Sequence, residues 1–385
     1  MLLFVLLSAS HVNAAPQVVI LQEPYVGRYL IPPGQKVDGI QGWPDKYYIR
    51  FDTVWSDFHK QYSNNNITFE VVIPQVPISM GITEGWYSGN STSTVSGIGL
   101  TTNNLSLIPG VDRFIGLGDY WSWSLGDTTA VNDTNNNSGN MRGMAIEMTH
   151  QWCCYAPPII EAITAYWKNN VNLFYGDTTK GEVMDSQTWV NNNGTWSCHT
   201  ANDQGITPAF SNITLYMMGL LDRTELAPLT IYNYSPINDG QHMGYNGDGP
   251  SCSEPQIDPG WNPATAFTGT QTLSITDIEA ALGKRNPSYA NSPKNFTAII
   301  FIVVPYGLAV DTNWINTHVN GYFTYFPAFW HSLTKNRSTM TFPDLNKTTA
   351  IPVLDKLGTI LFLLCNGMAL VYYFGRRAIT KKNSS

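Results

Sequence analysis

The sequence predicts an α+β ectodomain with a mixed sheet, followed by one C-terminal transmembrane helix. Two apolar runs rich in β-branched residues, 67–73 (ITFEVVI) and 297–305 (TAIIFIVVP), are typical of buried strands. Segments 141–155 and 322–333 have the apolar content and length of helices that pack on a core. The segment 357–374 is apolar over 18 residues without a charge, which is near the lower limit for crossing a bilayer.

The composition excludes some classes of protein. The chain has 385 residues, of which 43% are hydrophobic and only 13% are charged, and its formal net charge is −7. Such a chain can bury a large core, and it lacks the high charge and low hydrophobicity of a disordered protein. Because nucleic-acid binding requires a basic surface, an acidic chain of this kind is not expected to bind DNA or RNA.

The N-terminus predicts a signal peptide over residues 1–14. An uncharged apolar run, 2–7, precedes Val12 and Ala14, which are small residues at the −3 and −1 positions of a cleavage site after Ala14. The alternative is an ordinary buried strand. A glycosylated ectodomain is then expected over 15–333.

The C-terminus predicts a membrane anchor. A polar stalk, 334–356, leads into the proposed transmembrane helix, 357–374, and a short cytoplasmic tail, 375–385. The aromatic end of the span and the basic residues behind it agree with the positive-inside rule, so that the N-terminus lies outside. The alternatives are a buried core helix and a cleaved lipid-anchor signal.

Acceptor sites for N-linked glycans are spread between the two ends. The chain contains eleven Asn-X-Ser/Thr sites, at Asn66, Asn90, Asn104, Asn132, Asn136, Asn193, Asn212, Asn233, Asn295, Asn336 and Asn346. One such site is a weak signal because the pattern occurs by chance. Their number favours an ectodomain at the cell surface, in a membrane of the secretory pathway or in a viral envelope, where each used site must be exposed.

Four of the five cysteines lie before the predicted span: Cys153, Cys154, Cys198 and Cys252. In an oxidising compartment they predict two disulfides, with three possible connectivities. Because neighbouring cysteines rarely bond to each other, we expect Cys153 and Cys154 to reach separately to Cys198 and Cys252.

The remaining segments predict connecting elements. We expect a helix over 47–58, a loop or edge strand over 88–104, exposed loops over 131–140 and 235–263, and a short helix over 274–282. Ser274 and Thr276 are candidates for the N-cap of that short helix.

One helix carries residues with possible chemistry. Glu147 and His150 are three residues apart on one face of the predicted helix over 141–155. A zinc peptidase of the zincin type has the pattern H-E-x-x-H, in which two imidazoles bind the metal and the Glu polarises the bound water. The first His position is occupied here by Ile146, which has no lone pair to donate.

The segment that follows makes the pattern more specific. His150-Gln151-Trp152 matches the second half of the His-Glu-x-x-His-Gln-Trp motif of many zincins. Roughly residues 48–345 resemble a bacterial family of secreted zincin-like metallopeptidases. The matching pieces are 58–62 (FHKQY), the strand 67–73, 95–100 (VSGIGL), the motif helix, 166–167 (YW), 183–185 (VMD), 215–220 (LYMMGL), 275–278 (ITDI) and 303–305 (VVP).

The resemblance implies a zincin-like fold whose metal site has degenerated. In the family, a His-Trp pair after the motif helix supplies a further ligand, and this chain has Tyr166-Trp167 there. With Ile146 and Tyr166 at the two lost positions, His150 and Glu147 are too few for a catalytic zinc site, which keeps three protein ligands. No cofactor is therefore expected. Zinc would be bound only if an unusual set completed the site, and the candidates are Asp185, His199 and His242.

Three functional hypotheses follow. The favoured one is a single-pass type I surface glycoprotein with an inactive metallopeptidase-like ectodomain, which recognises or adheres to an extracellular protein or peptide. The second is a membrane-anchored zinc metallopeptidase, with Glu147 as the catalytic residue and His150 as a metal ligand. The third is a structural coat or envelope glycoprotein. The step from fold to recognition is an analogy, because one fold serves many functions.

Overall fold

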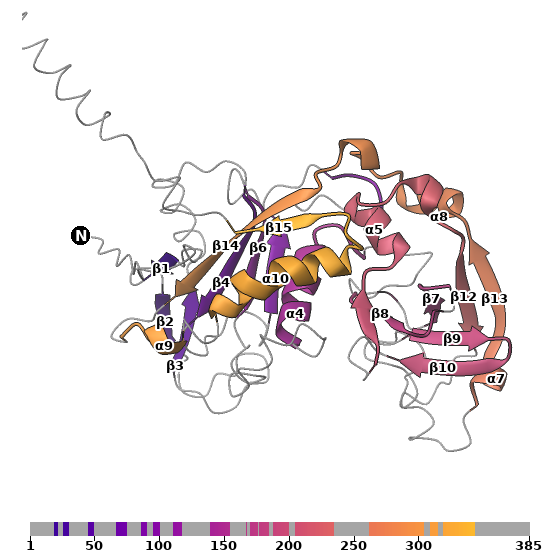
Figure 1. Cartoon of the computed structure of the whole chain (residues 1–385), viewed down its shortest axis with the longest axis horizontal. Coiled ribbons are helices and arrows are strands. Elements are labelled where there is room, and N and C mark those ends of the chain that lie inside the picture. Colours follow the sequence, from indigo (N-terminus) through magenta and orange to yellow (C-terminus); the bar gives the residue numbers. More distant parts are fainter. Residues whose placement is uncertain are drawn as a thin grey trace, which may run out of the picture.

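The structure is a computed structural model, shown in Figure 1. It describes residues 19–21, 26–30, 45–49, 67–74, 86–90, 95–100, 111–117, 139–154, 167, 170–175, 177–184, 188–199, 205–234, 262–303, 309–314 and 319–342. The predicted signal peptide, transmembrane segment and cytoplasmic tail lie outside these residues. So do residues 50–58 of the helix predicted over 47–58 and residues 235–261 of the loop predicted over 235–263.

A mostly parallel sheet forms the centre of the molecule. Its strand order is β1-β14-β4-β6-β5, and β15 also pairs with β14, parallel to it. Only the pair of β5 and β6 is antiparallel. The bounds are β1 Val19–Leu21, β4 Ile67–Pro74, β5 Trp86–Asn90, β6 Val111–Leu117, β14 Asn295–Val303 and β15 Thr339–Thr341. The strands predicted over 67–73 and 297–305 are confirmed as β4 and β14, which lie side by side in this sheet.

One face of the sheet is covered by α4 (Gly139–Thr149) and α10 (Asn320–Leu333), and aromatic side chains of α10 and of the segment after α4 pack against it. Phe69 of β4, Trp152 after α4 and Trp330 of α10 are at most 3% exposed. The ring centroids of Phe69 lie 5.9 Å from those of Trp152 and 6.3 Å from those of Trp330. Burial of each such ring is worth roughly 2–3 kcal/mol, so these contacts hold α4 and α10 on the sheet.

A second region consists of small sheets, drawn to the right in Figure 1. β12 (Leu229–Tyr234) pairs with β13 (Phe267–Leu273) and β7 (Val171–Asn172), both antiparallel. A hairpin of β9 (Thr188–Asn192) and β10 (Thr195–His199) packs on it. The contact is aromatic, because Trp196 stacks on Phe267 with ring centroids 4.5 Å apart. β8 (Lys180–Glu182) and β11 (Thr207–Ala209) form a short parallel pair.

Short helices connect these parts. α5 (Asn212–Met218) begins at the N-cap Ser211 and ends at Gly219, whose φ of 77° is in the left-handed region. The helix predicted over 274–282 is confirmed as α8 (Ile275–Leu282), with Ser274 as its N-cap in a capping box with Asp277. The remaining helices are η1 Arg223–Glu225, α7 Pro263–Ala266, η3 Tyr289–Asn291 and α9 Thr312–Trp314.

The predicted fold class is wrong. We expected an α+β ectodomain with a motif helix and a mixed sheet, followed by one C-terminal transmembrane helix, whereas the structure is mixed α/β. Helices fall between strands along the chain because parallel neighbours cannot be joined by a tight turn. None of the helices in the described ranges is long and apolar enough to span a membrane. The segment predicted to span, 357–374, is not among those ranges.

Two local predictions also need correction. Residues 47–49, predicted as the start of a helix, belong to β3 (Asp45–Ile49), which pairs with β2 (Val26–Leu30). Residues 334–342, predicted as the beginning of the stalk, are part of the folded body, since Thr334 and Met340 are at most 2% exposed and β15 lies in this stretch. The alternation of buried and exposed residues in this short strand was hidden by its polar composition.

Candidate functional site

The motif helix α4 lies in the apolar core. Met141, Met144, Ala145 and Met148 have no exposed surface, and Ile146 is half-buried against the same core. The two polar residues of the motif are buried as well, because Glu147 is 8% and His150 is 7% exposed. From 141 to 150 every residue except Ile146 is buried, so the helix is enclosed almost all round, as is typical of a packed interior element.

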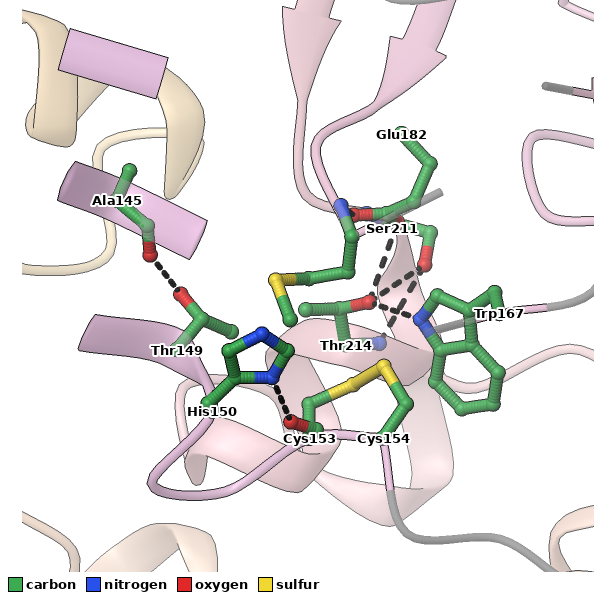
Figure 2. The surroundings of a disulfide bond; sticks show 10 residues. Ala145, Thr149, His150, Cys153, Cys154, Trp167, Glu182, Ser211 and Thr214 are labelled. Carbon is green, nitrogen blue, oxygen red and sulfur yellow. Dashed lines mark hydrogen bonds between the residues drawn. A yellow bond between two sulfur atoms is a disulfide. The ribbon is translucent and has the colours of Figure 1, made fainter. Parts of the chain in front are cut away.

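The end of α4 is fixed by local hydrogen bonds, shown in Figure 2. The hydroxyl of Thr149 donates to the carbonyl of Ala145 at 2.7 Å. The Nδ1 atom of His150 lies 3.3 Å from the carbonyl oxygen of Cys153. Because a carbonyl only accepts, this contact requires a proton on Nδ1, and it leaves Nε2 as the basic nitrogen of the ring.

Cys153 and Cys154 form a disulfide with each other. Both are completely buried, directly after the motif helix (Figure 2). The expectation that they reach separately to Cys198 and Cys252 is therefore wrong. Cys198 is also disulfide-bonded, with a partner outside the described residues, and Cys252 lies outside them too. The general rarity of bonds between adjacent cysteines misled the prediction.

This connectivity is open to a direct test. Proteolysis of the unreduced chain, with free thiols blocked beforehand, should give a peptide in which Cys153 and Cys154 are linked to each other and carry no blocking group. The peptide should gain two blocking groups only after reduction. A peptide joining either residue to Cys198 or Cys252 in the mass spectrum would contradict the arrangement of the structure.

A buried carboxylate belongs to the surroundings of this disulfide (Figure 2). Glu182 is the last residue of β8 and is 1% exposed. One carboxylate oxygen accepts from the backbone N–H of Met184 at 3.1 Å. The other accepts from the N–H of Ser211 at 2.6 Å and from the hydroxyl of Thr214 at 3.2 Å. The carboxylate thus joins β8 to the first turn of α5.

The network extends to the segment after the motif helix. The indole N–H of Trp167 donates to the hydroxyl oxygen of Thr214 at 2.8 Å, and Trp167 is 1% exposed. Trp167 is the second residue of the Tyr-Trp pair at which the resemblance places a lost ligand. Tyr166 lies outside the described residues. The part of this pair that the structure describes therefore serves a hydrogen-bond network.

Burial sets the electrostatics of this network. Desolvation raises the pKa of Glu182 above the ordinary value of 4.5, although its hydrogen bonds with Ser211, Met184 and Thr214 act in the opposite direction. Lys335 donates to the carboxamide of Asn212 at 2.8 Å, and burial lowers the pKa of its ammonium group while the charge of Glu182 raises it. Glu182 and Lys335 thus interact electrostatically, and each also bonds to a residue of the first turn of α5.

The end of α5 is surrounded by cationic side chains. Arg285, which is 4% exposed, donates to the carbonyls of Met217 and Met218 at 2.7 and 3.1 Å. Lys294 donates to the carbonyl of Gly219. Cations near the last carbonyls of a helix complement its dipole. These contacts hold the segment 215–220 in place, so that its role in the structure is packing.

Of the other sequence-predicted ligands, only His199 lies among the described residues. The Nε2 atom of His199 donates to the carbonyl of Lys180 at 3.1 Å. Asp185 and His242 lie outside the described residues. Within the ranges that the structure describes, no group of three or more His, Cys, Asp or Glu side chains could hold a metal ion.

Within the part of the chain that the structure describes, the donor set at the motif helix is too small for a catalytic zinc site. Glu147 and His150 supply one carboxylate and one imidazole, and Ile146 occupies the position of the missing imidazole. Cys153 and Cys154 supply no thiolate, because both sulfurs are in the disulfide. A catalytic zinc site needs three protein ligands and an open position.

Sequence reasoning missed three features of this region. Glu182 directly precedes the segment 183–185, yet a single acidic residue in a polar stretch carries no signal of burial. The bond between Cys153 and Cys154 was discounted, and the role of Trp167 as a donor was not considered. The contacts of Trp167 and Glu182 depend on residues distant in sequence, since Trp167 and Thr214 are 47 positions apart, whereas the disulfide joins adjacent residues.

Comparison with known proteins finds no relative of this chain. No family model, no curated protein sequence and no solved structure matches this chain. The class of the protein is thus defined by the structure itself, as a mixed α/β protein with a buried motif helix closed by a disulfide between adjacent cysteines.

Proposed function

We propose that this chain is a non-catalytic extracytoplasmic protein that recognises or adheres to a protein or peptide partner. The observation that carries the proposal is the burial of the motif helix and the oxidation of the cysteines that follow it. Its single imidazole is buried, and the two cysteines beside it are oxidised. A helix of the metallopeptidase type then serves as a core scaffold, which makes recognition a better account of the chain than peptide hydrolysis.

The proposed compartment is the secretory pathway or the cell surface. Disulfides persist in oxidising compartments, and all three cysteines in the described ranges, Cys153, Cys154 and Cys198, are disulfide-bonded. Several glycan acceptor sites are exposed, among them Asn193, Asn233, Asn295 and Asn336. A formal charge of −7 favours a protein or peptide partner over nucleic acid.

The loss of catalysis is tested by Glu147→Gln. In a hydrolase of the zincin type this carboxylate activates the water, so its removal would abolish cleavage. We expect wild type and variant to be equally inactive on a peptide library analysed by mass spectrometry, after incubation with zinc. Cleavage by the wild type that the folded variant lacks would establish the metallopeptidase alternative.

The second part of the proposal, recognition of a protein or peptide partner, is tested by a binding measurement. The purified chain, immobilised in its native state, should retain surface proteins or cells of its source, and heat-unfolded chain should not. Failure to retain any partner, together with ordered self-association of the chain in solution, would instead establish a structural coat protein.

A further inference from the structure

β13 is an exposed edge strand. Its end residues, Phe267 and Leu273, are buried, but all five residues between them are exposed. Within the part of the chain that the structure describes, β12 is the only strand paired with it. The exposed stretch, TGTQT, contains no charge and no proline. Such an edge offers unpaired backbone groups to a second chain, and proteins usually protect it.

Two glycan acceptor sites border this strand. Asn233 of β12 is exposed and lies opposite Gly269 of β13. An added Cβ at Gly269 would lie 3.7 Å from Nδ2 of Asn233. The absence of a side chain at this position leaves room beside the amide nitrogen that would carry the first sugar.

The second site lies at the tip of the hairpin of β9 and β10. Asn193 and Gly194 are exposed and both have positive φ, 50° and 89°, as expected for a tight hairpin turn. Trp196, three residues along, stacks on Phe267 at the beginning of β13. The hairpin tip is thus held close to the start of the exposed strand (Figure 1).

Other described acceptor sites differ in position. Asn212 begins α5, is only partly exposed and holds Lys335 through its carboxamide oxygen. Asn295 and Asn336 are exposed, but they belong to β14 and to the turn after α10. They therefore provide matched controls that carry glycans away from β13.

We propose that N-linked glycans on Asn193 and Asn233 cover β13 and prevent a second copy of the chain from pairing with it. In each modification, Nδ2 bonds to C1 of a sugar carried on a lipid pyrophosphate. The bond from C1 to the pyrophosphate oxygen breaks, the lipid pyrophosphate leaves, and Nδ2 loses one proton to solvent. The inference rests on the proposed extracytoplasmic location, since the sugar donor is available only there.

The test compares two double variants of the full chain made in a glycosylating secretory host. One is Asn193→Gln with Asn233→Gln, and the other is Asn295→Gln with Asn336→Gln. Each removes two sites, and each changes one residue with positive φ, because φ is 50° at Asn193 and 61° at Asn336. Glycan occupancy is mapped by peptide mass spectrometry, and molar mass is measured by light scattering after size exclusion.

We expect both pairs of sites to be occupied in the wild type. Removal of the pair beside β13 should at least double the molar mass, whereas removal of the remote pair should leave it unchanged. Adding Thr270→Lys to the first variant should restore the wild-type mass, because a lysine on an edge strand opposes pairing. Equal behaviour of the two double variants, or no rescue by Thr270→Lys, would overturn the proposal.

The same sample separates this inference from the proposed function. If Asn193 and Asn233 are bare while Cys153 and Cys154 are oxidised, the glycan inference fails and the extracytoplasmic location stands. If the sites are bare and both cysteines react as free thiols, the location itself is wrong.

Discussion

Replacement of Gly97 by alanine is expected to unfold the protein or to destabilise it by more than about 4 kcal/mol, which is exceptional for one methyl group. Loop 95–100 lies directly on the backbone of 282–286, with Ile98 N–H donating to Gly283 at 2.9 Å. A Cβ at Gly97 would overlap the carbonyl group of Lys284, whose carbon would lie 2.6 Å away. The φ of 76° adds strain for any residue with a Cβ.

Gly205→Ala is the matched control for this prediction. Gly205 has a similar φ of 82°, but an added Cβ there would meet no atom within 4 Å. The control therefore measures only the cost of placing a Cβ on a residue with positive φ. We expect this cost to be about 1–2 kcal/mol. Urea unfolding of both variants gives the comparison. Similar losses in the two variants would mean that loop 95–100 does not lie against Lys284.

Removal of the buried carboxylate is expected to have the next largest effect. Glu182→Ala leaves the N–H groups of Met184 and Ser211 and the hydroxyl of Thr214 without their acceptor in the interior. Each buried donor that loses its partner costs about 1–3 kcal/mol, so we expect a loss of about 4 kcal/mol in the free energy of unfolding. Glu225→Ala, at an exposed pair with Arg337, should cost at most about 1 kcal/mol.

The contribution of Glu182 to the free energy of unfolding also depends on pH. Because its folded pKa is raised above 4.5, the folded state holds this proton more tightly than the unfolded state does. The resulting stabilisation is present below pH 4.5 and is lost as the pH rises through the folded pKa. The stability of wild type relative to Glu182→Gln should thus be greatest in acid and should decline toward neutral pH. A difference that grows with pH in urea titrations would contradict the burial of this carboxylate.

The sequence patterns predicted the core elements well, for physical reasons. β4, β14, α8 and α10 have strong apolar periodicity or clear capping residues, and these signals are local. The class of the fold depends instead on which strands become neighbours. The parallel pairing of β4 with β14 joins residues more than 200 positions apart, and no local pattern encodes it.

The candidate site was predicted only in part. Glu147 and His150 were identified, and the structure places Glu147 on α4 and His150 directly after it, both buried in the core. Their surroundings could not be predicted, because the disulfide of Cys153 and Cys154 runs against a general tendency. The contacts of Glu182 with Ser211 and Thr214 form only after distant segments pack together.

We propose that α4 is a structural scaffold of the core and binds no metal. The most direct measurement is the zinc content of the full chain from a secretory host, determined by elemental analysis after dialysis against zinc. We predict far less than one zinc per chain, with no difference between wild type, His150→Ala and the control His331→Ala. One zinc per chain that is lost in His150→Ala and kept in His331→Ala would contradict the account and establish a metal centre on this helix.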